Sequence, residues 1–316
     1  FGGIDINDPL YESVTAGRKY QGMEHWLPLF YDHLSTLFDY LDDPIITLDL
    51  FPALRAALLA LLESLTDEEW QRPTRCCPGW SVKDMAAHLL GDHLGILSGQ
   101  RDRYSPPANL DLSDWDTLIH FINERNDVWV RAMRRLSPRL LIELLAETGP
   151  AVDDFFQTLD PFVPWVVVSW AGSDPAPGWL GITREYTEYW MHQQHIRDTV
   201  GQPGMKDLRF FAPVLEAFVR ALPRTFQDTG APEGTHIRVV ISGEAGSAWS
   251  LVREGTHWSL YRSAATPVTS QVTLDAETAW RLFTKGIAAD TAAQFIQIEG
   301  DAELGRVVLN MVSILA

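Results

Sequence analysis

The segment Thr183–Val200 carries metal-binding residue types at helical spacing. Glu188 and His192 are four residues apart, which places a carboxylate and an imidazole one turn apart on the same side of a helix. At about 100° per residue, His195 lies next to them, beside an apolar stripe of the same helix. Such a pair can share a divalent cation. The same spacing also occurs by chance on a solvated polar face, and spacing alone leaves both interpretations open.

A third ligand must come from another helix, and His88 is the candidate. It stands in the run MAAHLL at 85–90, with apolar neighbours on both sides. An imidazole in such surroundings must be hydrogen-bonded or metal-bound to offset its desolvation. Alone, His88 fits a core histidine that donates to a nearby carbonyl. Together with Glu188 and His192 it fits a site with two nitrogen donors, one oxygen donor and an open coordination position.

The elements that must position these residues are predicted to be helices. Leucines at helical spacing over 50–62 indicate the first helix. Ser81 with Asp84, and Ser113 with Asp116, form the Ser-x-x-Asp pattern of a capping box before two more helices. The first of these two helices carries His88 and is expected to run to about residue 101.

The second half of the helical region contains the Glu188 helix. Ser137 and Pro138 cap and begin a fourth helix, which the pair Gly149-Pro150 is expected to interrupt. A Pro/Gly-rich crossing over 160–178 precedes a fifth helix near 179–200, and a sixth follows near 208–226. The pattern predicts a helical bundle with one long crossover.

After Gly230 the apolar period changes to two residues, which is typical of strands. Alternating runs near 235–242, 249–251 and 258–260 predict three strands, with Glu254-Gly255 as a hairpin turn. Short strands are expected near 272–274 and 295–298, and helices near 276–285 and 301–315. This pattern predicts a small α+β domain. We expect domain boundaries at 1–46 for an appended segment, 47–205 for the bundle and 206–316 for the α+β domain.

Charge and cysteine content limit the possible functions. The 316 residues carry 25 Lys and Arg against 42 Asp and Glu, a formal net charge of −17. This balance disfavours nucleic acids and anionic membranes as partners, and no apolar run reaches the roughly 18–20 residues of a spanning helix. Two adjacent cysteines, Cys76 and Cys77, provide no disulfide framework, so we expect a reducing cytoplasm. The start Phe1-Gly2-Gly3 lacks Met and a signal segment, so we expect either missing first residues or a non-native start.

The first forty-six residues differ in character from the rest. The stretch 16–30 (AGRKYQGMEHWLPLF), continued by 37–41 (LFDYL), resembles part of the N-terminal module of bacterial transcription-repair coupling factors. About thirty residues are too few to fold as that module. We therefore interpret them as an appended or mis-joined segment without a DNA-repair function. The alternative is an unrelated helical extension that packs on the next domain.

The rest of the chain shows a second resemblance, which runs in consistent order from about residue 48 to 316. The motifs LTDEEWQRPT at 65–74, CPGWSVKD at 77–84, AHLLGD at 87–92, the segment 188–201 and GDAELGR at 300–306 resemble the mycothiol-dependent maleylpyruvate isomerase family. This family lies in the DinB-like metalloenzyme superfamily. The resemblance implies a two-domain α plus α/β fold: a DinB-like four-helix bundle followed by a small sterol-carrier-protein-like α+β domain. It also implies a divalent metal, usually zinc, held by His88, Glu188 and His192.

Two positions depart from the family pattern. His195 stands where relatives commonly carry Asp, and it can tune the metal, replace a substrate contact or serve as another ligand. Around Lys285 and Gly286, many relatives have a Gly-Arg pair. We expect Lys285 to take the cationic role of that arginine. Lys and Arg bind carboxylates differently. The carboxylate substrate of the family therefore does not carry over directly to this chain. We assign catalytic roles to His195 and Lys285.

The function expected from these residues is enzymatic. A zinc-activated thiolate of mycothiol, or of an equivalent low-molecular-weight thiol, would add to a small electrophilic substrate in an isomerase or S-transferase reaction. The alternative is a non-catalytic protein that binds an apolar small molecule and holds a structural metal. Cys77 can approach the site or simply pack as a small apolar residue.

Overall fold

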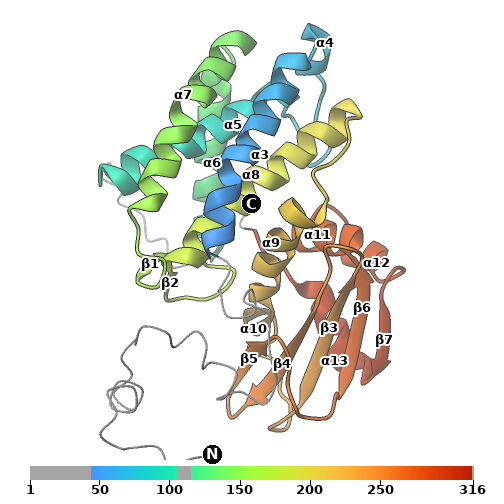
Figure 1. The fold of residues 1–316 in the computed structure, drawn as a ribbon. Coiled ribbons are helices and arrows are strands. Elements are labelled where there is room, and N and C mark those ends of the chain that lie inside the picture. The colour runs from blue at the N-terminus through green and yellow to red at the C-terminus, as the bar shows by residue number, and fades with distance from the viewer. Residues whose placement is uncertain (1–43, 105–114, 315–316) are drawn as a thin grey trace, which may run out of the picture. The chain divides into compact units, whose positions relative to one another are not determined.

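The structure is a computed structural model that describes residues 44–104 and 115–314 (Figure 1). The segment that resembles coupling factors and the Ser113 capping pattern lie outside the described residues. Residues 43–316 form one compact unit. None of the helices in the described ranges has the length and apolar character needed to span a bilayer.

The helical region confirms the predicted bundle. Its elements are α3 (Pro44–Ser64), α4 (Asp67–Trp70), α5 (Val82–Gly95), the π-helical turn η3 (Ile96–Arg101), α6 (Trp115–Met133), α7 (Pro138–Gln157), the strands β1 (Pro164–Val167) and β2 (Pro175–Pro177), and α8 (Gly178–Val200). Helices α3, α5, α7 and α8 pack together, with α3 against α7 and α8, and α5 against the same two helices. The hairpin of β1 and β2 lies within the crossover, where the sequence predicted no strand.

The expected interruption at Gly149-Pro150 is wrong, because α7 continues through Pro150 to Gln157. Four side chains of the helix are buried at helical spacing on both sides of this point: Leu141, Leu145, Val152 and Phe156. The proline itself is exposed. The free energy gained by burying this continuous apolar face outweighs the loss of the one backbone hydrogen bond that a proline cannot make.

The predicted sixth helix and the C-terminal helix are also broken into shorter pieces. Residues 208–226 form α9 (Leu208–Phe218), the 3₁₀ turn η4 (Val219–Ala221) and α10 (Leu222–Thr225). The helix expected over 301–315 ends early, as α13 (Ala302–Arg306) followed by η5 (Val307–Asn310). Ser313 then donates its backbone N–H to the Phe283 carbonyl and its hydroxyl to the Phe218 carbonyl, so the last described residues are held by the core instead of by a helix.

The C-terminal part is the predicted α+β domain. Its strands are β3 (His236–Ser242), β4 (Ala248–Glu254), β5 (His257–Tyr261), β6 (Ser270–Asp275) and β7 (Gln297–Gly300), in the sheet order β5-β4-β3-β6-β7. Only β3 and β6 are parallel among these pairs. The alternating residues Ile237, Val239 and Ile241 are buried, as the period of two predicted. Two further helices complete this part, α11 (Ala276–Phe283) and α12 (Ala289–Ala292).

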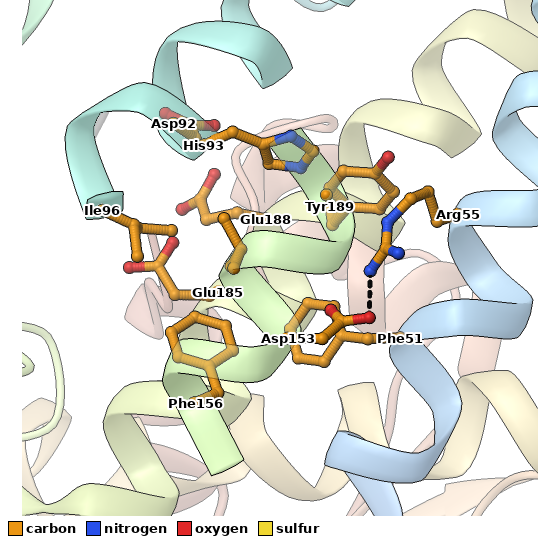
Figure 2. A pocket seen from close by; sticks show the side chains of 12 residues that line it. Phe51, Arg55, Asp92, His93, Ile96, Asp153, Phe156, Glu185, Glu188 and Tyr189 are labelled. Atoms are coloured by element: carbon orange, nitrogen blue, oxygen red, sulfur yellow. Dashed lines mark ion pairs between the residues drawn. The ribbon is translucent and has the colours of Figure 1, made fainter. Parts of the chain in front are cut away.

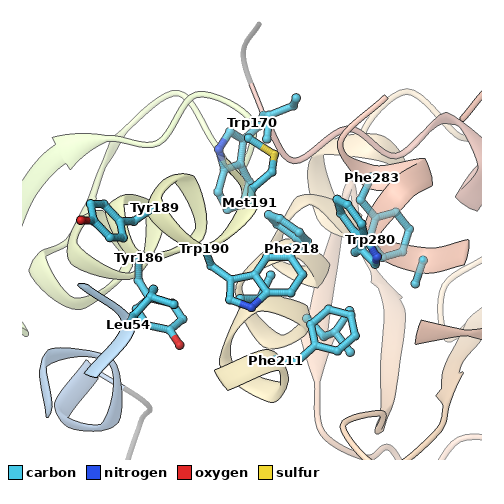
Figure 3. Close-up of a cluster of buried hydrophobic side chains, with 14 of the residues drawn as sticks. Leu54, Trp170, Tyr186, Tyr189, Trp190, Met191, Phe211, Phe218, Trp280 and Phe283 are labelled. Atoms are coloured by element: carbon cyan, nitrogen blue, oxygen red, sulfur yellow. The ribbon is translucent and has the colours of Figure 1, made fainter. Parts of the chain in front are cut away.

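The bundle and the sheet share one aromatic core through α8, α9 and α11. Trp190 of α8 stacks on Phe211 of α9 at 4.9 Å between ring centroids and meets Trp280 of α11 edge-on at 5.5 Å (Figure 3). Trp190 and Trp280 are fully buried. The boundary at residues 205 and 206 stays a prediction, but the apolar core runs across it.

The start of α5 has the capping box that the sequence predicted. The Ser81 side chain accepts from the Asp84 N–H, and Asp84 accepts from the Ser81 N–H. Arg134, which directly follows α6, adds two hydrogen bonds to the Asp84 carboxylate, each of 3.0 Å. Burial favours the neutral acid, but the hydrogen bonds from Arg134 and Ser81 outweigh it and lower the pKa of Asp84.

We predict that Asp84→Asn destabilises the protein by about 1–2 kcal/mol at neutral pH. The pKa of Asp84 is lower in the folded than in the unfolded protein, where it is about 4. Ionised Asp84 therefore stabilises the fold above about pH 4, and this stabilisation is lost as the pH falls through the folded pKa. The variant should therefore lose less stability than the parent on acidification. Denaturant unfolding at several pH values measures this. Asp127→Asn is the control, because its ion pair with Arg131 is exposed; equal acid sensitivity of the Asp84 variant and the parent would contradict the prediction.

Candidate metal centre

Helices α5 and α8 bring His88, Glu188 and His192 together. One ligand atom of each lies within 4.8 Å of the others. The Glu188 Oε2 atom is 3.3 Å from His192 Nε2, and the rings of His88 and His192 are 4.6 Å apart at 84°. Two helices separated by about a hundred residues thus present two nitrogens and one oxygen to a common point.

Both imidazoles are neutral at physiological pH. Burial lowers the pKa of His88 to about 3, assisted by His192. Burial also lowers the pKa of His192 to about 3, assisted by His195. Each ring is therefore available as a neutral nitrogen donor, which is the form that binds metals. The Nδ1 atom of His192 is buried without a hydrogen-bond partner.

Additional charged side chains lie around Glu188. Figure 2 shows the carboxylates of Asp92, Glu185 and Glu188 along one side of a small pocket, with an ion pair between Arg55 and Asp153 across it. Burial raises the pKa of Asp92, as do the charges of Glu185 and Glu188. Burial likewise raises the pKa of Glu185, although its ion pair with Arg184 opposes this.

These charges do not balance. When ionised, Asp92, Glu185 and Glu188 carry three negative charges, and Arg184 supplies one positive charge among them. A divalent cation next to Glu188 would neutralise the excess. The donor set fits a divalent cation such as zinc, and the excess negative charge would attract it.

The structure places His195 beside the three donors but not among them. Its ring is 5.5 Å from that of His192 and 6.0 Å from that of Trp280. Its Nδ1 atom is buried without a hydrogen-bond partner. The mutually close donors in the described part of the chain are His88, Glu188 and His192, so the catalytic role of His195 stays a prediction.

Lys285 lies on the turn that follows α11. It is exposed, its φ of 59° is in the left-handed region, and its N–H donates to the Leu282 carbonyl at 3.1 Å. The structure does not bring Lys285 into the group formed by the three donors. Its cationic role toward a substrate also stays a prediction.

A loop before α5 brings both cysteines to the site, an approach that the sequence analysis allowed for Cys77 but did not consider for Cys76. The Thr74 N–H donates to the Trp80 carbonyl at 2.8 Å, and the Trp80 N–H donates to the Cys77 carbonyl at 3.1 Å. The Trp80 ring lies 5.3 Å from that of His88. Cys76 and Cys77 are half-buried free thiols. The only sequence signal for this loop was its Pro-Gly-Trp content.

The two thiols differ in acidity because their neighbours differ. Interaction with Cys77 lowers the pKa of Cys76 to about 4, assisted by His195 and His192, while burial opposes the change. The interaction with Cys76 raises the pKa of Cys77, as do burial and the negative charge of Glu188. Cys76 is therefore the thiolate of the pair, and Cys77 is its hydrogen-bond donor.

Comparison with known proteins supports the resemblance drawn from the sequence. Residues 51–197 match the family model described as the mycothiol maleylpyruvate isomerase N-terminal domain. Crystal structures of mycothiol-dependent maleylpyruvate isomerase and of one of its mutants cover 85% of this chain and 98% of their own, with a TM-score of 0.50 and 13% identity. At that identity the likeness concerns the fold. The UbiJ-SCP2 ubiquinone synthesis protein aligns with 34% of this chain at a TM-score of 0.25, which does not establish a common fold.

The short resemblance to coupling factors is confirmed as well. Transcription-repair-coupling factors of Rickettsia bellii and Rickettsia typhi match 49 residues at 53% and 55% identity, which is 16% of this chain. The chain spans about 4% of the length of these relatives. A match of that extent transfers no activity.

We predict that iodoacetamide alkylates Cys76 before Cys77 at about pH 6. A thiol with a pKa of about 4 is already a thiolate there, whereas the raised pKa of Cys77 keeps it protonated. Fragmentation of the labelled peptide by mass spectrometry locates the label. His195→Ala should slow the labelling of Cys76, and in denatured protein the two cysteines should react alike. Equal labelling of both cysteines in the folded protein would contradict the assignment.

Proposed function

We propose that the chain is a metal-dependent enzyme that uses a low-molecular-weight thiol, mycothiol or an equivalent, against a small electrophilic substrate. The observation that carries the proposal is the convergence of His88, Glu188 and His192 from two helices. All three positions lie within the segment that matches the isomerase family model. The reaction is an isomerisation if the thiol leaves again, and an S-transfer if it stays attached.

His88, Glu188 and His192 would hold the cation, with zinc as the expected ion. When bound, the cation stabilises a thiolate and makes sulfur nucleophilic near neutral pH. The two imidazoles bind as neutral donors because burial disfavours their protonated forms. Glu188 contributes the negative charge, and its position one turn before His192 fixes both donors on a single rigid helix.

Three further residues have proposed roles around this group. His195, beside His192 and Cys76, is placed to accept or return a proton at the site. The Trp80 ring covers His88 and helps to exclude water. Lys285 is proposed as the cation for an anionic substrate group, which requires the turn after α11 to approach the site. The two free thiols fit the reducing cytoplasm expected from the sequence.

We predict that the purified protein contains close to one divalent ion per chain. His88→Ala and Glu188→Gln should lose it, because each removes one of three protein donors. Mass-spectrometric metal analysis after gel filtration measures the content. His120→Ala is the matched control, because His120 is an exposed histidine of the same bundle. Metal content that does not respond to either substitution would remove the proposed centre.

We also predict metal-dependent turnover with a thiol. The protein is incubated with mycothiol, bacillithiol or glutathione and a small electrophile that has a cis double bond, and conjugation or cis–trans isomerisation is followed by chromatography. Activity should vanish on chelation, return on adding Zn²⁺ and be absent in His88→Ala. Absence of turnover with every thiol, together with binding of an apolar dye, would instead favour the non-catalytic binding protein.

A further inference from the structure

The two helices of the site contribute matching pairs of side chains. On α5, His88 and Asp92 are four residues apart, and His88 Nε2 is 3.5 Å from Asp92 Oδ2. On α8, Glu188 and His192 are also four residues apart, and the corresponding distance is 3.3 Å. Each helix therefore offers one imidazole and one carboxylate at nearly the same separation, although only the α8 pair and His88 form the group of mutually close donors.

Asp92 lies among carboxylates that share one guanidinium. Arg184 forms its ion pair with Glu185 and also attracts Asp92 and Glu188. Asp92 contacts the His88 ring as well. Asp92 and Glu188 line the same pocket, and Figure 2 shows their carboxylates next to each other. Three carboxylates around one guanidinium repel one another when ionised, and a divalent cation between them would relieve this repulsion.

We infer that Asp92 is a fourth protein ligand of the metal, which completes a centre of two histidines and two carboxylates. This inference rests on the proposed function. Asp92 is half-buried, and coordination would require rotation about its two side-chain torsions to bring a carboxylate oxygen to the other donors. Each helix would then contribute one imidazole and one carboxylate.

A fourth ligand changes what the centre does. Two nitrogens and two carboxylate oxygens accept the harder ions Mn²⁺, Fe²⁺ and Co²⁺ as well as Zn²⁺. Four protein donors would leave no vacancy in a four-coordinate site, so a thiol would have to replace Asp92. Asp92 would thereby strengthen metal binding and weaken thiol binding. Alternatively, Asp92 could orient the His88 ring through a hydrogen bond without contacting the metal. That role does not predict that loss of Asp92 weakens metal binding and strengthens thiol binding.

The test has two titrations. In the first, Co²⁺ is added to the metal-free full chain, and binding is monitored by the visible absorption of the ion. In the second, 2-mercaptoethanol is added to the Co²⁺-loaded protein, and binding is monitored by the sulfur-to-cobalt charge-transfer band. Asp92→Asn should weaken Co²⁺ binding by more than about 100-fold, beyond the roughly 10- to 100-fold that loss of an outer hydrogen bond costs, and should change the visible spectrum. It should bind 2-mercaptoethanol more tightly than the parent. Glu185→Gln is the charge-matched control and should not raise the thiol affinity. Asp92→Ser is a second variant, and circular dichroism confirms that each is folded.

The outcomes separate the inference from the proposed function. If the parent binds Co²⁺ and His88→Ala does not, the centre exists, and the Asp92 variants decide the inference. An unchanged spectrum in both Asp92 variants, or weaker thiol binding in them, overturns the role of Asp92 as a ligand and leaves the three-residue centre intact. A parent that fails to bind Co²⁺ overturns both.

Discussion

Two imidazoles buried edge-to-face between α5 and α8 are the constraint on which the rest of the site depends. At 4.6 Å between ring centroids, His88 and His192 cannot both be protonated, and burial lowers the pKa of each to about 3. Such a contact places nitrogen lone pairs in the core and costs free energy unless they are satisfied. A cation bound by both rings and by Glu188 would remove this cost, so that the same three side chains would serve both the stability of the fold and the chemistry of the site.

The bundle fixes these two helices by contacts on their other sides. Trp129 of α6 donates to the Ala87 carbonyl at 2.7 Å, next to His88. Gln193 of α8, the neighbour of His192, donates to the Leu54 carbonyl of α3 at 3.0 Å. Each ligand-bearing helix is therefore hydrogen-bonded to a neighbour within one residue of its histidine. Donors held in this way would be preorganised for an ion, which would lower the entropic cost of binding it.

Much of the fold and the donor group could be predicted because both follow local rules. A capping box, an i to i+4 pair and one histidine in an apolar run are visible in the sequence, and the change of period after Gly230 marks the sheet. The continuation of α7 through Pro150 could not be predicted, since it depends on burial against other helices. The position of Cys76 could not either, because a loop of turn-forming residues has no period that would orient its side chains.

The α+β domain contributes a wall beside the candidate metal centre, although the sequence separates this domain from the bundle. Trp280 of α11 lies against both Trp190 and His195, so one wall beside the donors belongs to the C-terminal domain. Arg281 forms an ion pair with Asp198 at 2.7 Å, three residues beyond His195 on α8. Any movement of α11 relative to α8 would displace Trp280 from the His195 ring. The C-terminal domain therefore shapes the surroundings of His195, while the three candidate donors lie within the bundle.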